Sequence, residues 1–246
     1  MGTSVSMKNL LVTDVYTTQQ GDNKGAMTLT CQANGQTITV RTVVLRDPST
    51  KKLATEDMLL NKTNTKADDI SFLFGGDLLN QCIGSSFDMR DLGFCFAGLY
   101  GACSTMALST GLASIFIDCG AAEKAVAVTS SHFCSAERQY RFPLNYGSQR
   151  TPTAQWTVTG SGALVLSNAD KGAYINSVTF GKIVDFGICD ANNMGAAMAP
   201  AAADTLINFF KDTNSAPEDY DIIFTGDLGR VGTLALYELC LKDGVD

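Results

Sequence analysis

One pattern of fifteen residues occurs twice in the chain, and this repeat constrains the fold more than any other feature of the sequence. Residues 64–78 are NTKADDISFLFGGDL and residues 214–228 are NSAPEDYDIIFTGDL, and the two align without gaps at an offset of 150 residues. Each copy combines a helix-capping signal, an apolar strand and a Gly-Asp turn. The repeat predicts an internal duplication into two similar α/β halves. Asp77 and Asp227 would then lie at the carboxyl ends of equivalent strands, where open α/β sheets bind ligands.

The sequence around the two copies has the pattern of an α/β protein from residue 64 onward. Continuous apolar runs predict buried strands, and the 3.6-residue period predicts helices. The expected elements are strands at 70–77, 93–103 and 122–132, a small-residue helix at 104–118, an antiparallel pair at 155–167 and 174–185, a helix at 199–212, a strand at 220–227 and a helix at 233–244. Pro200 is expected near the first turn of its helix, where proline is tolerated.

The first 63 residues have a different character. Residues 8–46 contain three runs rich in Val, Thr and Ile, which predict a small antiparallel sheet. Asn34-Gly35 marks a hairpin between the second and third runs. These runs resemble a short part of an OB-fold barrel. We therefore expect a β-rich appendage at 1–63 and a second domain at 64–246, divided into a first half at 64–190 and the start of a second half at 191–246.

Charge and composition exclude several classes of function. The chain has 246 residues, with 18 Lys and Arg against 25 Asp and Glu, so its formal net charge is −7. An acidic chain argues against nucleic-acid binding and against attraction to anionic lipid. No apolar run is long enough for a membrane span, and the N-terminus lacks the features of a signal peptide. No phosphate-binding glycine motif occurs, so nucleotide binding has no support.

The eight cysteines and the single histidine limit the possible chemistry. No two cysteines are closer than eight positions apart, which excludes a zinc ribbon and disfavours a disulfide framework. Most of them fit buried thiols in a reducing cytoplasm. A mechanism that needs two histidines is impossible within this chain.

The sequence Gly101-Ala102-Cys103-Ser104-Thr105 lies between a predicted strand and a predicted helix. Cys103 would then lie at a helix N-terminus, where amides and the helix dipole favour a thiolate. Two interpretations stay open: a nucleophile or ligand-contacting thiol, and a small residue in a tight turn.

The Gly-Asp turns and the region after residue 129 are the other candidates. The two aspartates either face one pocket or cap the helices that follow them. Arg230 beside the second turn either binds an anion or is a surface charge. His132, Glu137, Arg138 and Arg141 form a polar cluster that either lines a site or joins two subunits.

The motifs GGDLLNQ, GACST, TSSH…AERQYRFP, TVTGSGALVLS, MGAAMAPAAADT and YDIIFTGDL resemble the stage V sporulation protein AD family, whose members have the thiolase fold. The resemblance begins near Asn64. It implies an α/β, thiolase-like layered mixed sheet with Cys103 in the place of the acyl-accepting cysteine. It also implies a non-catalytic protein that binds dipicolinic acid, the pyridine dicarboxylate of spores, for uptake into the developing spore. The candidate ligand-binding residues are Asp77, Cys103, Asp227 and His132.

The resemblance has further implications for cofactors and partners. No cofactor or protein metal site is expected, although calcium could accompany dipicolinate and bridge it to carboxylates. The expected partners are sporulation membrane proteins of the same operon type, and the expected location is the cytoplasm or the periphery of the inner spore membrane. The family's opening strand and helices and most of the second thiolase half, with its general-base histidine and second cysteine, are expected to be missing. The alternative function is a thiolase-like or ketoacyl-synthase-like acyltransferase that uses Cys103.

The last expectation concerns assembly. Thiolase-fold relatives pair through the strand nearest AVAVTSS, which implies a homodimer. Ala125–Ser131 is apolar and short-chained, so it could approach a two-fold neighbour closely. Such pairing would cover an edge of the sheet.

Overall fold

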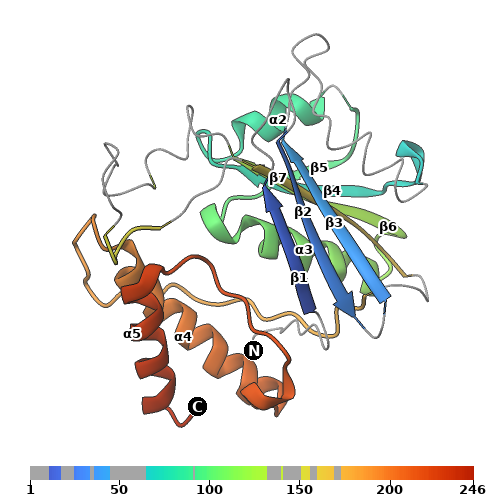
Figure 1. The fold of residues 1–246 in the computed structure, drawn as a ribbon. Helices are drawn as coiled ribbons and strands as arrows, with labels where there is room; N and C mark the ends of the chain where they lie inside the picture. Colours follow the sequence, from blue (N-terminus) through green and yellow to red (C-terminus); the bar gives the residue numbers. More distant parts are fainter. Residues whose placement is uncertain are drawn as a thin grey trace. The chain divides into compact units, whose positions relative to one another are not determined.

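The computed structural model divides the chain into two compact units (Figure 1). One unit comprises residues 11–136 and 158–173, and the other comprises residues 1–10, 137–157 and 174–246. The structure describes residues 65–90, 92–131, 140, 151–155, 160–168 and 173–246, together with the backbone of 11–17, 25–33 and 36–44.

Three strands near the N-terminus form a small antiparallel sheet in the order β1-β2-β3. The strands are β1 (Leu11–Thr17), β2 (Gly25–Ala33) and β3 (Gln36–Val44). Ala33 pairs with Gln36, so two residues connect β2 to β3, as the Asn-Gly signal predicts. The prediction of a three-stranded sheet is confirmed.

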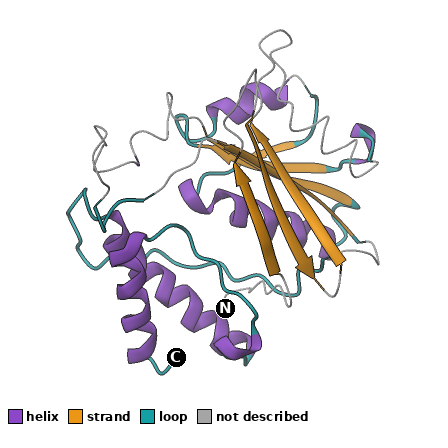
Figure 2. Ribbon diagram, in the orientation of Figure 1, coloured by secondary structure: helices purple, strands orange, loops and turns teal. Residues whose placement is uncertain are grey.

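A second, mixed sheet of the same unit has the order β5-β4-β6-β7. Figure 2 shows the strands in orange and the helices in purple. The strands of the mixed sheet are β4 (Phe72–Asp77), β5 (Phe96–Gly98), β6 (Lys124–Ser131) and β7 (Gly160–Ser167). β4 runs parallel to both β5 and β6, whereas β7 runs antiparallel to β6. The predicted α/β class and mixed sheet are confirmed, although β5 is much shorter than the apolar run at 93–103.

The position of β6 corrects the expected dimer edge. Ala125–Ser130 is hydrogen-bonded to β4 on one side and to β7 on the other, within one chain. Its edges are therefore already occupied, and the proposed pairing through this strand is wrong. Ala127 is fully buried, so an arginine at this position would disrupt folding rather than assembly.

Buried apolar side chains pack on both faces of the mixed sheet. On one face Leu73, Val126 and Val128 pack with Met89 of helix α2 (Ile83–Arg90). On the other face Phe74 and Ala127 pack with Ala113 of helix α3 (Thr105–Asp118). Leu73 and Phe74 point to opposite faces because side chains alternate along a strand.

Two helices, α4 (Met194–Thr213) and α5 (Gly229–Lys242), form the core of the other unit. Their backbones approach at glycines, since a Cβ atom on Gly232 would lie 2.7 Å from the carbonyl carbon of Gly195. α4 begins five residues before the predicted start, and Asn193 caps it through the amide of Ala196. Pro200 therefore lies inside the helix and not in its first turn, which corrects that prediction.

Two predicted strands do not form. Residues 174–185 and 220–227 belong to no strand, and β7 pairs with β6 instead of with 174–185. The apolar pattern is present in both segments, but a strand also needs a neighbour that pairs with its backbone. Neither segment has such a neighbour within the described residues.

Short 3-10 helices occur at η1 (Ala67–Asp69), η2 (Ala102–Ser104) and η4 (Pro217–Asp219). None of the helices that the structure describes is both long and apolar enough to cross a membrane.

Candidate functional site

The carboxyl ends of three parallel strands meet at one edge of the mixed sheet. β4 ends at Asp77, β5 leads into the turn that contains Cys103, and β6 ends at Ser131. The hydroxyl of Thr129 near the end of β6 donates to the carbonyl of Gly76, at 3.1 Å. This edge is where an open α/β sheet is expected to bind a ligand.

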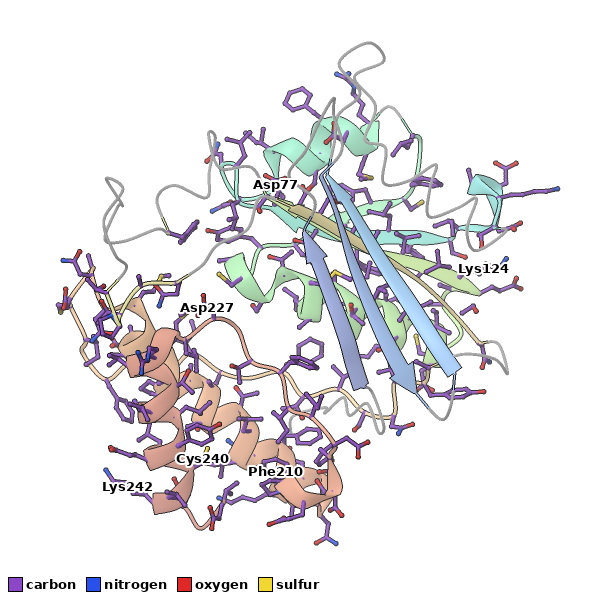
Figure 3. The ribbon with its side chains drawn as sticks, viewed as in Figure 1. Asp77, Lys124, Phe210, Asp227, Cys240 and Lys242 are labelled. Carbon is purple, nitrogen blue, oxygen red and sulfur yellow. The ribbon has the colours of Figure 1, made fainter. Side chains whose placement is uncertain are left out.

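Figure 3 labels Asp77, the last residue of β4. It is buried, and both of its carboxylate oxygens accept hydrogen bonds. Oδ1 accepts the amide of Leu79 at 2.7 Å, and Oδ2 accepts both the amide and the hydroxyl of Ser85, at 2.6 and 2.8 Å. Ser85 is the third residue of α2, so Asp77 satisfies one of the amides that a helix start leaves without a partner. The capping interpretation therefore holds for Asp77.

The loop between β4 and α2 has an unusual backbone. Asn80 and Gln81 both have positive φ angles, of 43° and 71°, which is costly for residues other than glycine. A Cβ atom on Gly84 would lie 3.1 Å from Oδ2 of Asp77, so the helix start lies directly against the carboxylate. The hydrogen bonds of Asp77 hold both ends of this loop.

Cys103 is exposed in the middle of η2, immediately before α3. Ala102 before it has a φ of +49°. The turn is closed by the amide and hydroxyl of Ser104, which both donate to the carbonyl of Gly101, at 2.9 and 2.8 Å. The buried Thr105 hydroxyl donates to the carbonyl of Ala102 and accepts the amide of Gly101. A network within the turn thus holds the thiol at the start of α3.

The end of β4 and the Cys103 turn are in close contact. A Cβ atom on Gly76 would lie 1.9 Å from the carbonyl oxygen of Leu99 and 3.4 Å from Cγ2 of Thr105. Only glycine allows this approach, and the structure therefore brings the Asp77 and Cys103 turns together at one edge of the sheet.

Asp227 lies in the other unit, ahead of α5 (Figure 3). It is exposed, and its Oδ1 accepts the amide of Gly229 at 2.9 Å. The carbonyl of Pro152 accepts the next two amides of α5, from Arg230 and Val231. Arg230 itself is exposed.

Some predicted site residues lie outside the described part of the chain, and one structural partner was not predicted. His132, Glu137, Arg138 and Arg141 fall in the undescribed stretches. Ser85 was missed because it is eight residues from Asp77 and has no motif of its own. Within the described residues, no group of three or more His, Cys, Asp or Glu side chains is arranged to hold a metal ion.

Comparison with solved structures defines the class. The chain is similar to a tetronic acid condensing enzyme, with a TM-score of 0.52 and 15% sequence identity over 77% of this chain and 65% of that one. The fold is therefore thiolase-like.

The sequence defines the family. Residues 49–246 match the family model described as Stage V sporulation protein AD, and the chain belongs to that family. The curated Stage V sporulation protein AD of Bacillus subtilis (strain 168) is 47% identical over 188 residues, which are 76% of this chain and 56% of the relative. The chain thus spans little more than half the length of this relative.

Proposed function

We propose that this member of the family is a non-catalytic protein that binds dipicolinic acid, so that this compound can be taken up into the developing spore. The observation that carries the proposal is the edge of the mixed sheet, where the exposed Cys103 turn lies against the end of β4. A planar dianion placed there would have its carboxylate at the start of α3, a helix of 14 residues. Backbone amides and the dipole at a helix start favour such a group.

The hydrogen bonds of Asp77 explain how an acidic residue fits a site for a dianion. Three donors, on Leu79 and Ser85, bond to its oxygens. Donors of this kind offset the negative charge of a carboxylate. Asp77 then acts as a positioning residue for the loop, and calcium, where it takes part, would arrive as the chelate with dipicolinate. Asp227 and His132 remain candidate contacts to the ligand.

Calorimetry with dipicolinate, with and without calcium, tests the proposal on the full chain. We expect saturable binding heat. We expect Cys103→Ala to weaken the affinity for dipicolinate at least tenfold. Cys119→Ala is the matched control, because Cys119 is also exposed but lies at the opposite end of α3. A folded protein that gives no heat in either condition contradicts the proposal.

An acyltransferase that uses Cys103 is the second candidate. The exposed thiol of Cys103 favours it, because an accessible cysteine is the nucleophile that such an acyl transfer needs. The single histidine of the sequence disfavours it, since condensation needs a base and an oxyanion hole as well as a thiolate. A mass increase at Cys103 after incubation with an acyl-CoA would support this candidate. Cys240 provides an internal control, because burial raises the pKa of its thiol.

A homodimer, sporulation membrane proteins as partners and a place at the inner spore membrane are also proposed. β6 cannot supply the dimer edge, but β7 is the last strand in the order of the mixed sheet. Light scattering would measure the mass. Sedimentation with vesicles that contain the membrane partner, compared with vesicles alone, would test recruitment.

A further inference from the structure

A hollow of about 210 Å³ lies between α4, α5 and the segment at residues 184–186. All of its lining residues belong to one unit, whereas the edge of the mixed sheet belongs to the other, so this is a separate site. Pockets for drug-sized ligands have roughly 300–1,000 Å³. A ligand that fits this hollow must therefore be smaller than that.

One wall of the hollow is apolar. Pro200, Ala203 and Ile207 follow one another at helical spacing along α4, and all three are buried. Leu239 of α5 and Val184 complete this wall. Such a wall binds the apolar part of a ligand, because contact removes apolar surface from water.

The remaining part of the hollow carries charges of both signs. Lys211 lies in the last turn of α4, and Asp243 is the C-cap residue of α5. The carboxylate of Asp204 is already paired with Lys182, at 3.0 Å. Lys211 and Asp243 are exposed, and neither forms an ion pair within the described part of the chain. The hollow thus offers one cation and one anion to a ligand.

The surroundings of these two charges indicate what each would hold. A helix C-terminus is the negative end of the helix dipole, so the carboxylate of Asp243 lies where a ligand cation is favoured. The ammonium of Lys211 has three donors and no acceptor, which suits a carboxylate. The amide nitrogen of Asn208 donates to the carbonyl of Asp204, 2.7 Å away, and its amide oxygen can accept from a ligand. A ligand with both an ammonium and a carboxylate matches all of these groups.

We propose that this hollow binds a free α-amino acid with an aliphatic side chain. The carboxylate of the ligand pairs with Lys211 and its ammonium with Asp243, while its side chain packs between Ile207 and Leu239. A zwitterion fits this place better than an anion, because the chain has a net charge of −7 and two carboxylates line the hollow.

Calorimetry with L-leucine on the full chain tests the proposal. The two comparison ligands keep the branched aliphatic chain of leucine: isocaproate lacks its ammonium group, and isoamylamine lacks its carboxylate. We expect leucine to bind saturably and at least tenfold more tightly than either analogue. The proposal is overturned if the folded chain binds leucine no more tightly than the analogues.

Three variants, each checked for folding by circular dichroism, locate the site. Lys211→Met and Asp243→Asn should each weaken leucine binding at least tenfold. Lys242→Met is the matched control, because it removes the same charge beside Asp243 from a residue that does not line the hollow. It should leave binding unchanged. An equal loss in Lys242→Met and Lys211→Met would also overturn the proposal, since the effect would then be one of general charge.

Discussion

The first copy of the repeat, residues 64–78, and the second, residues 214–228, each contain a short 3-10 helix and an aspartate that accepts the amide two residues after it. The apolar residues of the first copy are buried, whereas Ile223 and Phe224 of the second are exposed. β4 has a strand on each side and a helix over each face. Residues 222–227 have neither strand neighbour among the described residues. Local sequence therefore specifies the turn and the cap, while the neighbouring strands decide whether an apolar segment becomes part of a sheet.

The largest difference between the copies is expected at their phenylalanines. Phe74→Ala should lower the free energy of unfolding by about 3–5 kcal/mol, because the ring is buried and packs edge-on against Phe116, 4.8 Å away. Phe224→Ala should change it by no more than about 0.5 kcal/mol. Urea denaturation followed by circular dichroism measures both. Equal losses would show that the second copy is also buried.

The glycines before the two aspartates should differ next. Gly76→Ala would force a Cβ atom against the carbonyl of Leu99, so we expect a loss of about 1–3 kcal/mol. A Cβ atom on Gly226 meets nothing within 4 Å. Gly226→Ala should be neutral or stabilise by up to about 1 kcal/mol, through the unfolded chain. Thermal denaturation of the pair measures the contrast, and a costly Gly226→Ala would contradict it.

The aspartates should differ by a smaller amount. Asp77→Asn places an amide group where three donors need acceptors, and should cost about 1–3 kcal/mol. Asp227→Asn should cost no more than about 0.5 kcal/mol, because the side chain is exposed. The same denaturation measurement applies. A harmless Asp77→Asn would remove the positioning role that we give to this residue.

The smallest effect concerns pH and the capping aspartate of η1. The backbone hydrogen bond from Lys66, together with the Lys124 ammonium 3.2 Å away, lowers the pKa of Asp69 below 3.8. A lowered pKa in the folded state means that the contribution of Asp69 is present above the unfolded pKa and is lost as the pH falls through the folded one. Both side chains are partly exposed, so the effect on stability is small.

Carboxyl-carbon NMR measures this pKa directly. Lys124→Met should raise the pKa of Asp69 toward 3.8. Lys182→Met is the control, because Lys182 pairs with Asp204 instead. An unchanged titration in Lys124→Met would leave the backbone bond as the sole cause.

Where the apolar pattern and the tertiary neighbours agree, the sequence was sufficient to predict the fold. β4, β6 and α3 lie within two residues of their expected bounds, and Asp77 lies at the carboxyl end of its strand as predicted. Asp227 does not follow a strand, because residues 220–227 form none. The expected strand at 174–185 failed for the same reason as 220–227. Ile183 in this segment is 98% exposed, so its side chain does not pack against any of the described residues as a buried strand would.

Two errors have local causes. Pro200 suggested a helix start, but Asn193 caps the helix earlier, and the residues between them, such as Ala196 and Ala199, are good helix formers. The bond between Asp77 and Ser85 could not be predicted, because it depends on Asn80 and Gln81 adopting positive φ angles that their residue types rarely take.

The order of the mixed sheet also has a consequence for biosynthesis. β4 is translated before either of its neighbours, and 47 positions separate Asp77 from Lys124, the first residue of β6. At roughly 5–20 residues per second, a ribosome needs about 2–10 s to reach β6. During that interval the nascent chain presents Leu73 and Phe74 to chaperones and to other chains. For the first copy this exposure ends when β6 emerges and pairs with β4.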